Sequence, residues 1–189
     1  MKLILTRHGE TIENKKNIMQ GHLPGRLSKQ GISQAKKLAL RLKNEKIDAL
    51  YSSPLKRASD TAKIIAQFHP DVPFFLAEEL KEIDIGPYTG KPRYMIDWQK
   101  RYKDVESRTS MRKRGKKILD VAYKKYPTGT VVFIAHAGIN KALISVIMHL
   151  PATEMNMLPK IHNTSVSIFE IREDRKHKVH LLNCTKHLK

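Results

Sequence analysis

Residues 130–138 read Thr-Val-Val-Phe-Ile-Ala-His-Ala-Gly, and this segment indicates the fold class. Its first six residues form an unbroken run rich in β-branched side chains, which is typical of a central strand covered on both faces. His136 and the small pair Ala137-Gly138 end this strand and open a predicted helix that continues to His149. A strand that leads directly into a helix is the repeating unit of α/β proteins.

The same alternation of strands and helices extends outward from this stretch in both directions. Short apolar runs predict further strands at residues 2–6, 47–51 and 72–76. Helical spacing predicts helices at residues 32–43, 93–102 and 110–126, and another that begins with Ser53 as N-cap and Pro54 as first helical residue. Alternating residues at 165–171 and 179–182 predict a closing hairpin. We therefore expect an α/β fold: a three-layer αβα sandwich with a largely parallel central sheet and a C-terminal antiparallel strand or hairpin.

Length and composition limit the alternatives. The chain has 189 residues, 40% of them hydrophobic, which fits a single domain over residues 1–189. Its first residues contain too few consecutive apolar side chains for a signal or membrane helix, so we expect a cytoplasmic protein without a membrane partner. The one cysteine, Cys184, cannot form an internal disulfide or a Cys-x-x-Cys site.

The chain is strongly basic, with 36 Lys and Arg against 18 Asp and Glu, a formal charge of +18. Residues 91–125 hold thirteen basic and four acidic residues, and we expect a short basic lid-like segment at about 91–117. Such a charge favours anionic partners, and weak binding of polyanions is one expectation. A basic nucleic-acid-binding domain is an alternative, but only 6% of the residues are aromatic, few for base stacking.

Five side chains with phosphate chemistry follow the predicted strands. Arg7 and His8 follow the first, Arg57 the second, Glu82 the third, and His136 the central strand. Because ligands of open α/β sheets bind beyond the carboxyl ends of the strands, these five side chains are expected to meet at one edge.

This set suits phosphoryl transfer without a metal or cofactor. An imidazole can attack phosphorus and hold the group as phosphohistidine, and arginines match phosphate oxygens with planar, permanent charges. The same cations disfavour a protonated histidine. A carboxyl group at Glu82 can protonate the leaving oxygen and then activate water. Helix N-termini near Ser53 and Ala137 are expected to add backbone donors for phosphate.

These residues lie in motifs that resemble the histidine phosphatase superfamily, which has the phosphoglycerate mutase-like fold. The matching stretches follow the family order at residues 5–11, 20–23, 27–31, 51–58, 80–86 and 134–138. The resemblance implies that His8 is the phosphorylated nucleophile, that Glu82 is the proton donor, and that Arg7, Arg57 and His136 bind the phosphoryl group. It also implies that Asn14, Gln20 and Gly21 surround the phosphate or substrate.

Departures from the family pattern narrow the expected activity. Tyr88 stands where many relatives have tryptophan, and Val-Glu-Ser at residues 105–107 replaces Gly-Glu-Ser, with Arg114 at a position where the family often has arginine. The short stretch between Gly90 and Ser110 favours hydrolysis, because a mutase must keep water from the phosphoenzyme. We therefore expect a phosphatase acting on a small phosphorylated substrate, with mutase-type phosphoryl transfer as the alternative. The sequence leaves the substrate, the oligomeric state and the role of His22 open.

Overall fold

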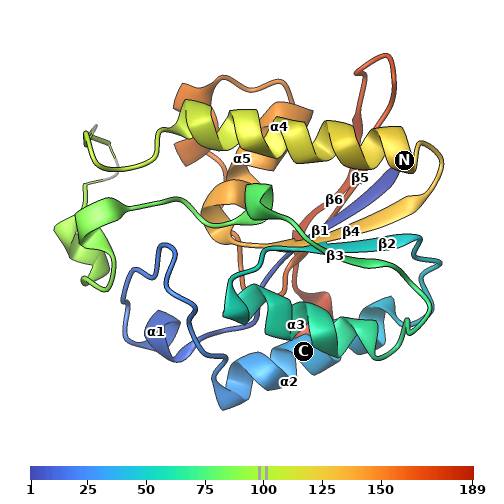
Figure 1. Ribbon diagram of the computed structural model, residues 1–189, viewed down its shortest axis with the longest axis horizontal. Coiled ribbons are helices and arrows are strands. Elements are labelled where there is room, and N and C mark those ends of the chain that lie inside the picture. The colour runs from blue at the N-terminus through green and yellow to red at the C-terminus, as the bar shows by residue number, and fades with distance from the viewer. Residues whose placement is uncertain (98, 101) are drawn as a thin grey trace.

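A six-stranded mixed sheet forms the centre of the computed structural model, which describes residues 1–97, 99–100 and 102–189 (Figure 1). The strands are β1 (Lys2–Arg7), β2 (Ala49–Ser52), β3 (Phe74–Leu76), β4 (Thr130–Ala135), β5 (Val166–Glu170) and β6 (Lys178–Cys184). Their spatial order is β3-β2-β4-β1-β5-β6. The first four strands in this order pair in parallel, whereas β5 is antiparallel to both β1 and β6. The predicted fold class is confirmed.

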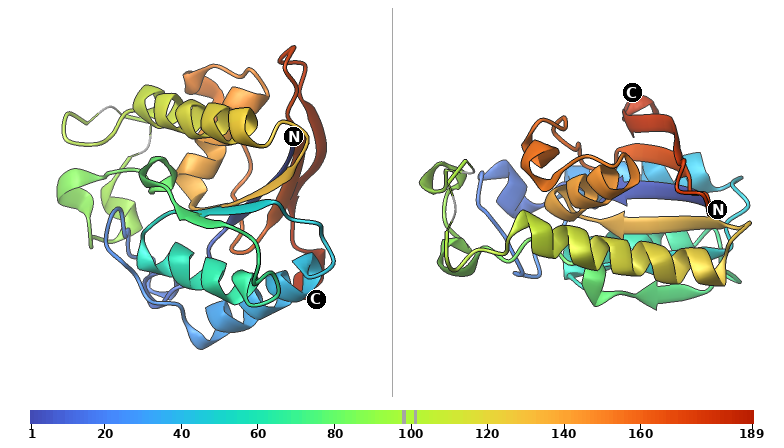
Figure 2. Two further views of the ribbon diagram at one scale, coloured as in Figure 1. Left: turned by 45° about the vertical axis from the view of Figure 1, so that its right-hand side comes forward. Right: turned by 90° about the horizontal axis from the view of Figure 1, so that it is seen from above.

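Helices cover both faces of the sheet (Figure 2). Helices α2 (Lys29–Leu42) and α3 (Lys56–Ala66) lie on one face, and α4 (Arg108–Lys125) and α5 (Ala137–Ile147) lie on the other. Side chains of β4 alternate between these layers: Val132 and Ile134 pack in the cluster with α2 and α3, and Val131 and Phe133 in the cluster with α4 and α5. This two-sided burial explains why the strand is apolar at every position after Thr130.

Two of the long helices begin at serine caps. The Ser28 side chain accepts a hydrogen bond from Gly31 N–H at the start of α2, and Ser107 accepts one from Ser110 N–H at the start of α4. These bonds satisfy backbone donors that a helix N-terminus leaves unpaired. The caps also place both helices a few residues earlier than the apolar spacing alone predicted.

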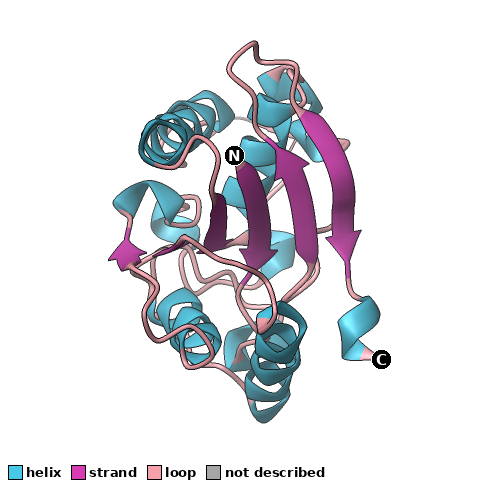
Figure 3. Ribbon diagram, turned by 90° about the vertical axis from the view of Figure 1, so that its right-hand side faces the viewer, coloured by secondary structure: helices cyan, strands magenta, loops and turns pink. Residues whose placement is uncertain are grey.

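The predicted C-terminal hairpin is confirmed. Strand β6 lies at one edge of the sheet, and the last turn, Lys186–Leu188, lies beside α2 (Figure 3). The Lys37 Nζ donates to the Leu188 carbonyl at 2.9 Å, which ties the end of the chain to that helix. Among the described residues, no helix has both the length and the apolar character needed to cross a membrane.

The helix predicted at residues 93–102 is wrong in the part that the structure describes; residues 98 and 101 lie outside the described residues. Only Arg93–Met95 forms a 3₁₀ turn. The Arg93 N–H donates to the Asn17 carbonyl at 2.9 Å, and Ile96 packs in a small buried cluster with Met19. Pairing with the loop after β1 therefore replaces the local helical hydrogen bonds that the sequence favoured.

The predicted start of α3 is also wrong. The helix begins at Lys56 with Leu55 at the N-cap position, and Pro54 precedes it. The Ser53 side chain accepts a hydrogen bond from Leu55 N–H at 3.2 Å, so it closes a turn ahead of the helix. Its hydroxyl also contacts His136, which a local capping pattern does not reveal.

Candidate active site

His8 lies just past the carboxyl end of β1 and is only 2% exposed. Its N–H donates to the Ala135 carbonyl at 3.0 Å, so the residue continues the pairing of β1 with β4. The His8 Nδ1 is 2.7 Å from the Gly9 carbonyl oxygen. Because a carbonyl can only accept, Nδ1 carries the proton and Nε2 carries the lone pair.

His136 faces His8 from the end of β4. The two ring centroids are 5.1 Å apart, with the rings tilted by 57°. The His136 Nε2 is 2.8 Å from the Ser53 hydroxyl at the end of β2. Its Nδ1 is buried and has no hydrogen-bond partner in the described part of the chain.

Two buried arginines flank the histidines. The Arg7 Nη1 donates to the Ile161 carbonyl at 2.8 Å, and the Arg57 Nη2 donates to the Gly21 carbonyl at 2.9 Å. Arg57 Nη1 also binds the Leu23 carbonyl. The Nε of each arginine is buried without a partner among residues 1–97, 99–100 and 102–189. Backbone carbonyls thus hold Nη1 of Arg7 and both outer nitrogens of Arg57 and leave the Nε donors unused.

Glu82 reaches the same edge from the segment after β3, and its carboxylate sits at the N-terminus of α5. Its Oε1 accepts hydrogen bonds from Gly138 N–H at 3.0 Å, Ile139 N–H at 3.3 Å and Ile83 N–H at 3.0 Å. The Oε2 lies 3.2 Å from Gly138 N. A negative charge is stabilised at this helix end by the unpaired N–H groups and the helix dipole. The donors expected near Ala137, the first residue of α5, are thus partly engaged by Glu82.

Burial and neighbouring cations keep both histidines neutral. Burial lowers the pKa of His8 well below 6.5, and the charges of Arg7 and Arg57 lower it further. Burial also lowers the pKa of His136 well below 6.5, with Arg57 as the next cause. Burial lowers the pKa of each arginine to about 10, opposed by the charge of Glu82. The sequence predicted the direction of the histidine shifts from the cations, but burial is the larger cause.

The other predicted site residues build the loop beside the arginines. Asn14 forms a reciprocal cap with Thr11 at the start of α1 (Ile12–Lys15). The Gln20 Nε2 donates to the Thr11 hydroxyl at 2.9 Å, and its Oε1 is buried with no partner in the described residues. Gly21 has a φ of +48°, which favours glycine, and its carbonyl accepts from Arg57.

Three further residues contact the site, although the sequence assigned their side chains no role in it. Ser53 contacts His136, and Thr61 accepts from Gly9 N–H at 3.1 Å while it donates to the Arg57 carbonyl at 2.8 Å. The Asn163 Nδ2 donates to the His8 carbonyl at 2.9 Å. The position of Thr61 four residues after Arg57 is a helical spacing that could have indicated it, whereas nothing local marks Asn163.

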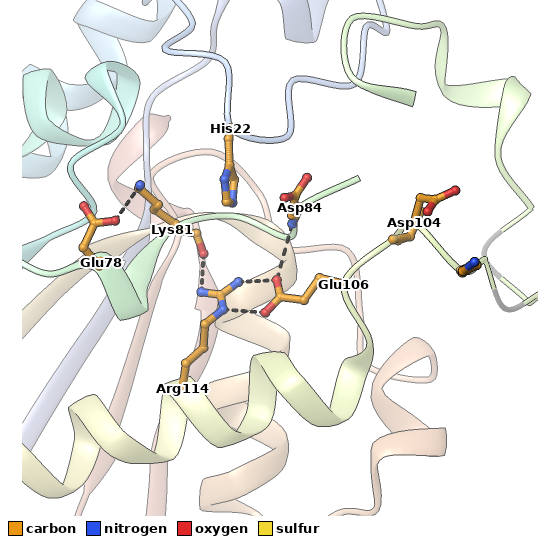
Figure 4. Close-up of a pocket in the computed structure, with 9 residues that line it drawn as sticks. His22, Glu78, Lys81, Asp84, Asp104, Glu106 and Arg114 are labelled. Carbon is orange, nitrogen blue, oxygen red and sulfur yellow. Dashed lines mark hydrogen bonds and ion pairs between the residues drawn. The ribbon is translucent and has the colours of Figure 1, made fainter. Parts of the chain in front are cut away.

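A cleft of about 610 Å³ lies beside the Glu82 segment (Figure 4). Its lining includes His22, Lys81, Glu106 and Arg114 but, among the described residues, none of the two histidines, two arginines and one glutamate described above. His22 Nε2 is 2.9 Å from the Glu82 carbonyl, so this histidine contacts the backbone that carries the carboxylate.

Two neutral histidines, two cations and a carboxylate therefore lie together at the carboxyl ends of the parallel strands, the edge at which α/β enzymes bind ligands. The family model of the histidine phosphatase superfamily (branch 1) matches residues 3–185. The chain belongs to this superfamily, as its motifs implied.

Known relatives agree with this membership. The chain is 30% identical to a metal-independent phosphoserine phosphatase of Arabidopsis thaliana, over 92% of this chain and 78% of that protein. The structure of Bacillus stearothermophilus YhfR has a TM-score of 0.92 and 26% identity, covering 100% of this chain and 99% of the other. A mutant phosphoserine phosphatase from Entamoeba histolytica, in complex with phosphoserine, has a TM-score of 0.88 and 30% identity, with coverage of 100% and 99%. The expected enzyme class, a phosphatase hydrolase, is confirmed.

Proposed function

We propose that this phosphatase hydrolyses phosphate monoesters through a phosphohistidine on His8. The Nε2 lone pair attacks phosphorus, the bond from phosphorus to the ester oxygen breaks, and that oxygen takes a proton from Glu82. Water then attacks the phosphohistidine, with the Glu82 carboxylate as base, so that the bond from phosphorus to Nε2 breaks and inorganic phosphate leaves. At the end of the cycle, Nδ1 and Nε2 of His8 and the carboxyl group of Glu82 return to their starting protonation states.

One observation carries this proposal: the Nε atoms of Arg7 and Arg57 and the Nδ1 of His136 are buried and lack partners in the part of the chain that the structure describes. An unpaired buried polar group costs roughly 1–3 kcal/mol, so three such groups beside one histidine need a functional reason. The oxygens of a phosphoryl group accept from the arginine Nε–H groups, and from His136 Nδ1 in the tautomer that carries its proton there. Two guanidinium charges there also neutralise the charge that spreads over the transferred group.

The hydrogen bonds of Glu82 distinguish its two oxygens. Its Oε1 accepts from three backbone N–H groups, whereas Oε2 shares only the Gly138 N–H at 3.2 Å. An oxygen that already accepts three bonds has no room for a proton. We therefore assign the transferred proton to Oε2, while the bonds to Oε1 keep the carboxyl group in place.

The substrate class is a small phosphorylated compound, and phosphoserine is the first candidate because it is named for two of the relatives above. Mutase-type transfer differs in the fate of the phosphoryl group, which would pass to a second substrate instead of water. A cytoplasmic location, weak polyanion binding and a single domain over residues 1–189 stay predictions from the sequence.

Phosphate release with chelator present tests the proposal on phosphoserine, sugar phosphates, phosphoglycerates and nucleotides. We expect His8→Ala to lose at least about 1,000-fold in kcat/KM, since the nucleophile is gone. His69→Ala is the matched control, because His69 is also buried, at 8% exposed, but lies outside the site. Rapid quenching of the reaction should trap an acid-labile phosphate on His8 of the starting protein. No such phosphate should form on His8→Ala. Full activity in folded His8→Ala would sink the proposal.

A further inference from the structure

A partly buried ion pair lies behind the segment that carries Glu82 (Figure 4). It joins Arg114 of α4 to Glu106, which precedes that helix. The Arg114 Nε is 2.8 Å from Glu106 Oε1, and Nη2 is 2.8 Å from Oε2, so the two planar groups meet through two parallel hydrogen bonds. Their side chains are 18% and 13% exposed, which shields the pair from water.

The remaining donors of Arg114 all bind the backbone around Glu82. Nη1 donates to the carbonyls of Glu79, at 2.7 Å, and Lys81, at 2.5 Å, and Nη2 donates to the Glu82 carbonyl at 3.1 Å. A guanidinium has five N–H groups, and these contacts use every one of them. Arg114 therefore has no donor left for a substrate, although the sequence placed it in a basic lid-like segment.

Glu106 holds the same segment from its other side. Its N–H donates to the Asp84 carbonyl at 2.7 Å, and its Oε2 accepts from Asp84 N–H at 3.3 Å. Nearby, a side chain at Gly86 would put its Cβ only 2.1 Å from the Asp104 carbonyl, so the two stretches of backbone are in direct contact. Together, Arg114 and Glu106 fix the backbone on both sides of Glu82.

The other end of Glu82 is fixed by α5, which packs against α4. A Cβ built on Gly115 of α4 would make an ordinary contact with Leu143 of α5, at 3.4 Å, so the two helices pack together next to Arg114. The Glu82 carboxylate accepts from the first turn of α5. One pair of packed helices thus sets both the backbone and the carboxylate of this residue.

We infer that the Glu106–Arg114 ion pair positions Glu82 for proton transfer. Neither residue touches the site of the reacting phosphate, so both are positioning residues. The inference rests on the proposed acid and base role of Glu82. Without the two side chains of the ion pair, the segment from Glu79 to Asp84 loses four hydrogen bonds, and the carboxyl group moves relative to His8.

Leaving-group dependence tests this inference. Phenyl phosphate and p-nitrophenyl phosphate have similar shapes, but only the poorer leaving group, phenolate, depends strongly on a proton from the enzyme. For Arg114→Lys, which keeps the charge but loses the planar fork, kcat/KM should fall roughly 10- to 100-fold more on phenyl phosphate than on p-nitrophenyl phosphate, because kcat/KM reports the step in which the leaving group departs. Glu106→Gln should show the same larger loss on phenyl phosphate than on p-nitrophenyl phosphate. It replaces Arg114→Lys as the test if that variant does not fold.

Arg112→Lys is the matched control, because Arg112 lies on the same helix and binds the Ser145 hydroxyl and the Leu150 carbonyl away from Glu82. Any effect there should be equal on both esters. Glu82→Gln in the same series separates the acid role of Glu82 from the positioning role of the ion pair. If Glu82→Gln lowers kcat/KM equally on both esters, the acid role fails and the positioning role with it. If Glu82→Gln shows the larger loss on phenyl phosphate but Arg114→Lys and Glu106→Gln do not, only the positioning role is overturned.

Discussion

A methyl group at Gly138 should displace the Glu82 carboxylate without damage to the fold. A Cβ built at this position would lie 2.5 Å from the Glu82 Oε1, against about 3.4 Å for an ordinary contact. The carboxylate must therefore move by about 0.9 Å. Gly138 is the second residue of α5, where alanine is favoured over glycine by about 0.5–1 kcal/mol. This gain offsets the weakened hydrogen bonds to the carboxylate, about 1 kcal/mol.

We expect Gly138→Ala to lower kcat/KM on phenyl phosphate by roughly 100-fold, because displacement of a catalytic group by about 1 Å costs about that much. The loss on p-nitrophenyl phosphate should be much smaller, and the free energy of unfolding should stay within about 1 kcal/mol of the starting protein. Steady-state phosphate release and urea unfolding measure both quantities.

Gly115→Ala is the control for this change. It also adds a methyl group to a helical glycine, but its nearest neighbours are Leu143 and Ile139 at 3.4 Å or more, away from the carboxylate. Its activity should be unchanged on both esters. An unchanged rate on phenyl phosphate for a stable Gly138→Ala would refute the reasoning, and so would an equal loss on both esters.

Three further predictions concern pH, the second histidine and the core. The pKa of His8 lies well below 6.5 in the folded protein, so kcat/KM should hold at pH 6.5 and fall only at a pH well below it. In urea unfolding, the free energy of unfolding should begin to drop below pH 6.5, because there the unfolded chain binds a proton that the folded protein does not, and this pH dependence should be weaker in His8→Asn. Ser53→Ala removes the hydroxyl 2.8 Å from His136 and should lower kcat/KM roughly 3- to 10-fold, whereas Ser59→Ala on α3 should not. Phe133→Ala should reduce the free energy of unfolding by about 3–5 kcal/mol, since this side chain is fully buried in the layer facing α4 and α5; a loss under 1 kcal/mol would contradict that packing.

Much of the fold follows from local patterns in the sequence. The apolar runs of β1 and β4 and the helical spacing of α2 and α4 are properties of short segments, so they are visible without knowledge of contacts. The failure at residues 93–102 has the opposite cause. There the backbone bonds go to Asn17 and its neighbours, some 75 residues earlier in the chain, and no local pattern reports such a partner.

In the basic segment, too, the sequence reveals the charge of the side chains but not their partners. Its charge is evident from composition, but the structure assigns several of its cations to contacts within the protein. Arg112 and Arg114 bind backbone carbonyls, and Lys117 pairs with Glu79 at 2.8 Å. Surface pairs of this kind contribute little to stability, whereas the shielded Arg114 pair organises a segment of the site.

By itself, the sequence determined the layered α/β architecture and the candidates Arg7, His8, Arg57, Glu82 and His136, because strand ends and motifs are written in consecutive residues. The pKa values and the positions of these groups depend on the tertiary structure. Burial in the closed site sets the histidine pKa values, the start of α5 holds the Glu82 carboxylate, and Arg114 fixes its backbone from a helix more than thirty residues away. Desolvation and hydrogen-bond geometry depend on which segments meet in space, and that depends on the packing of the whole chain.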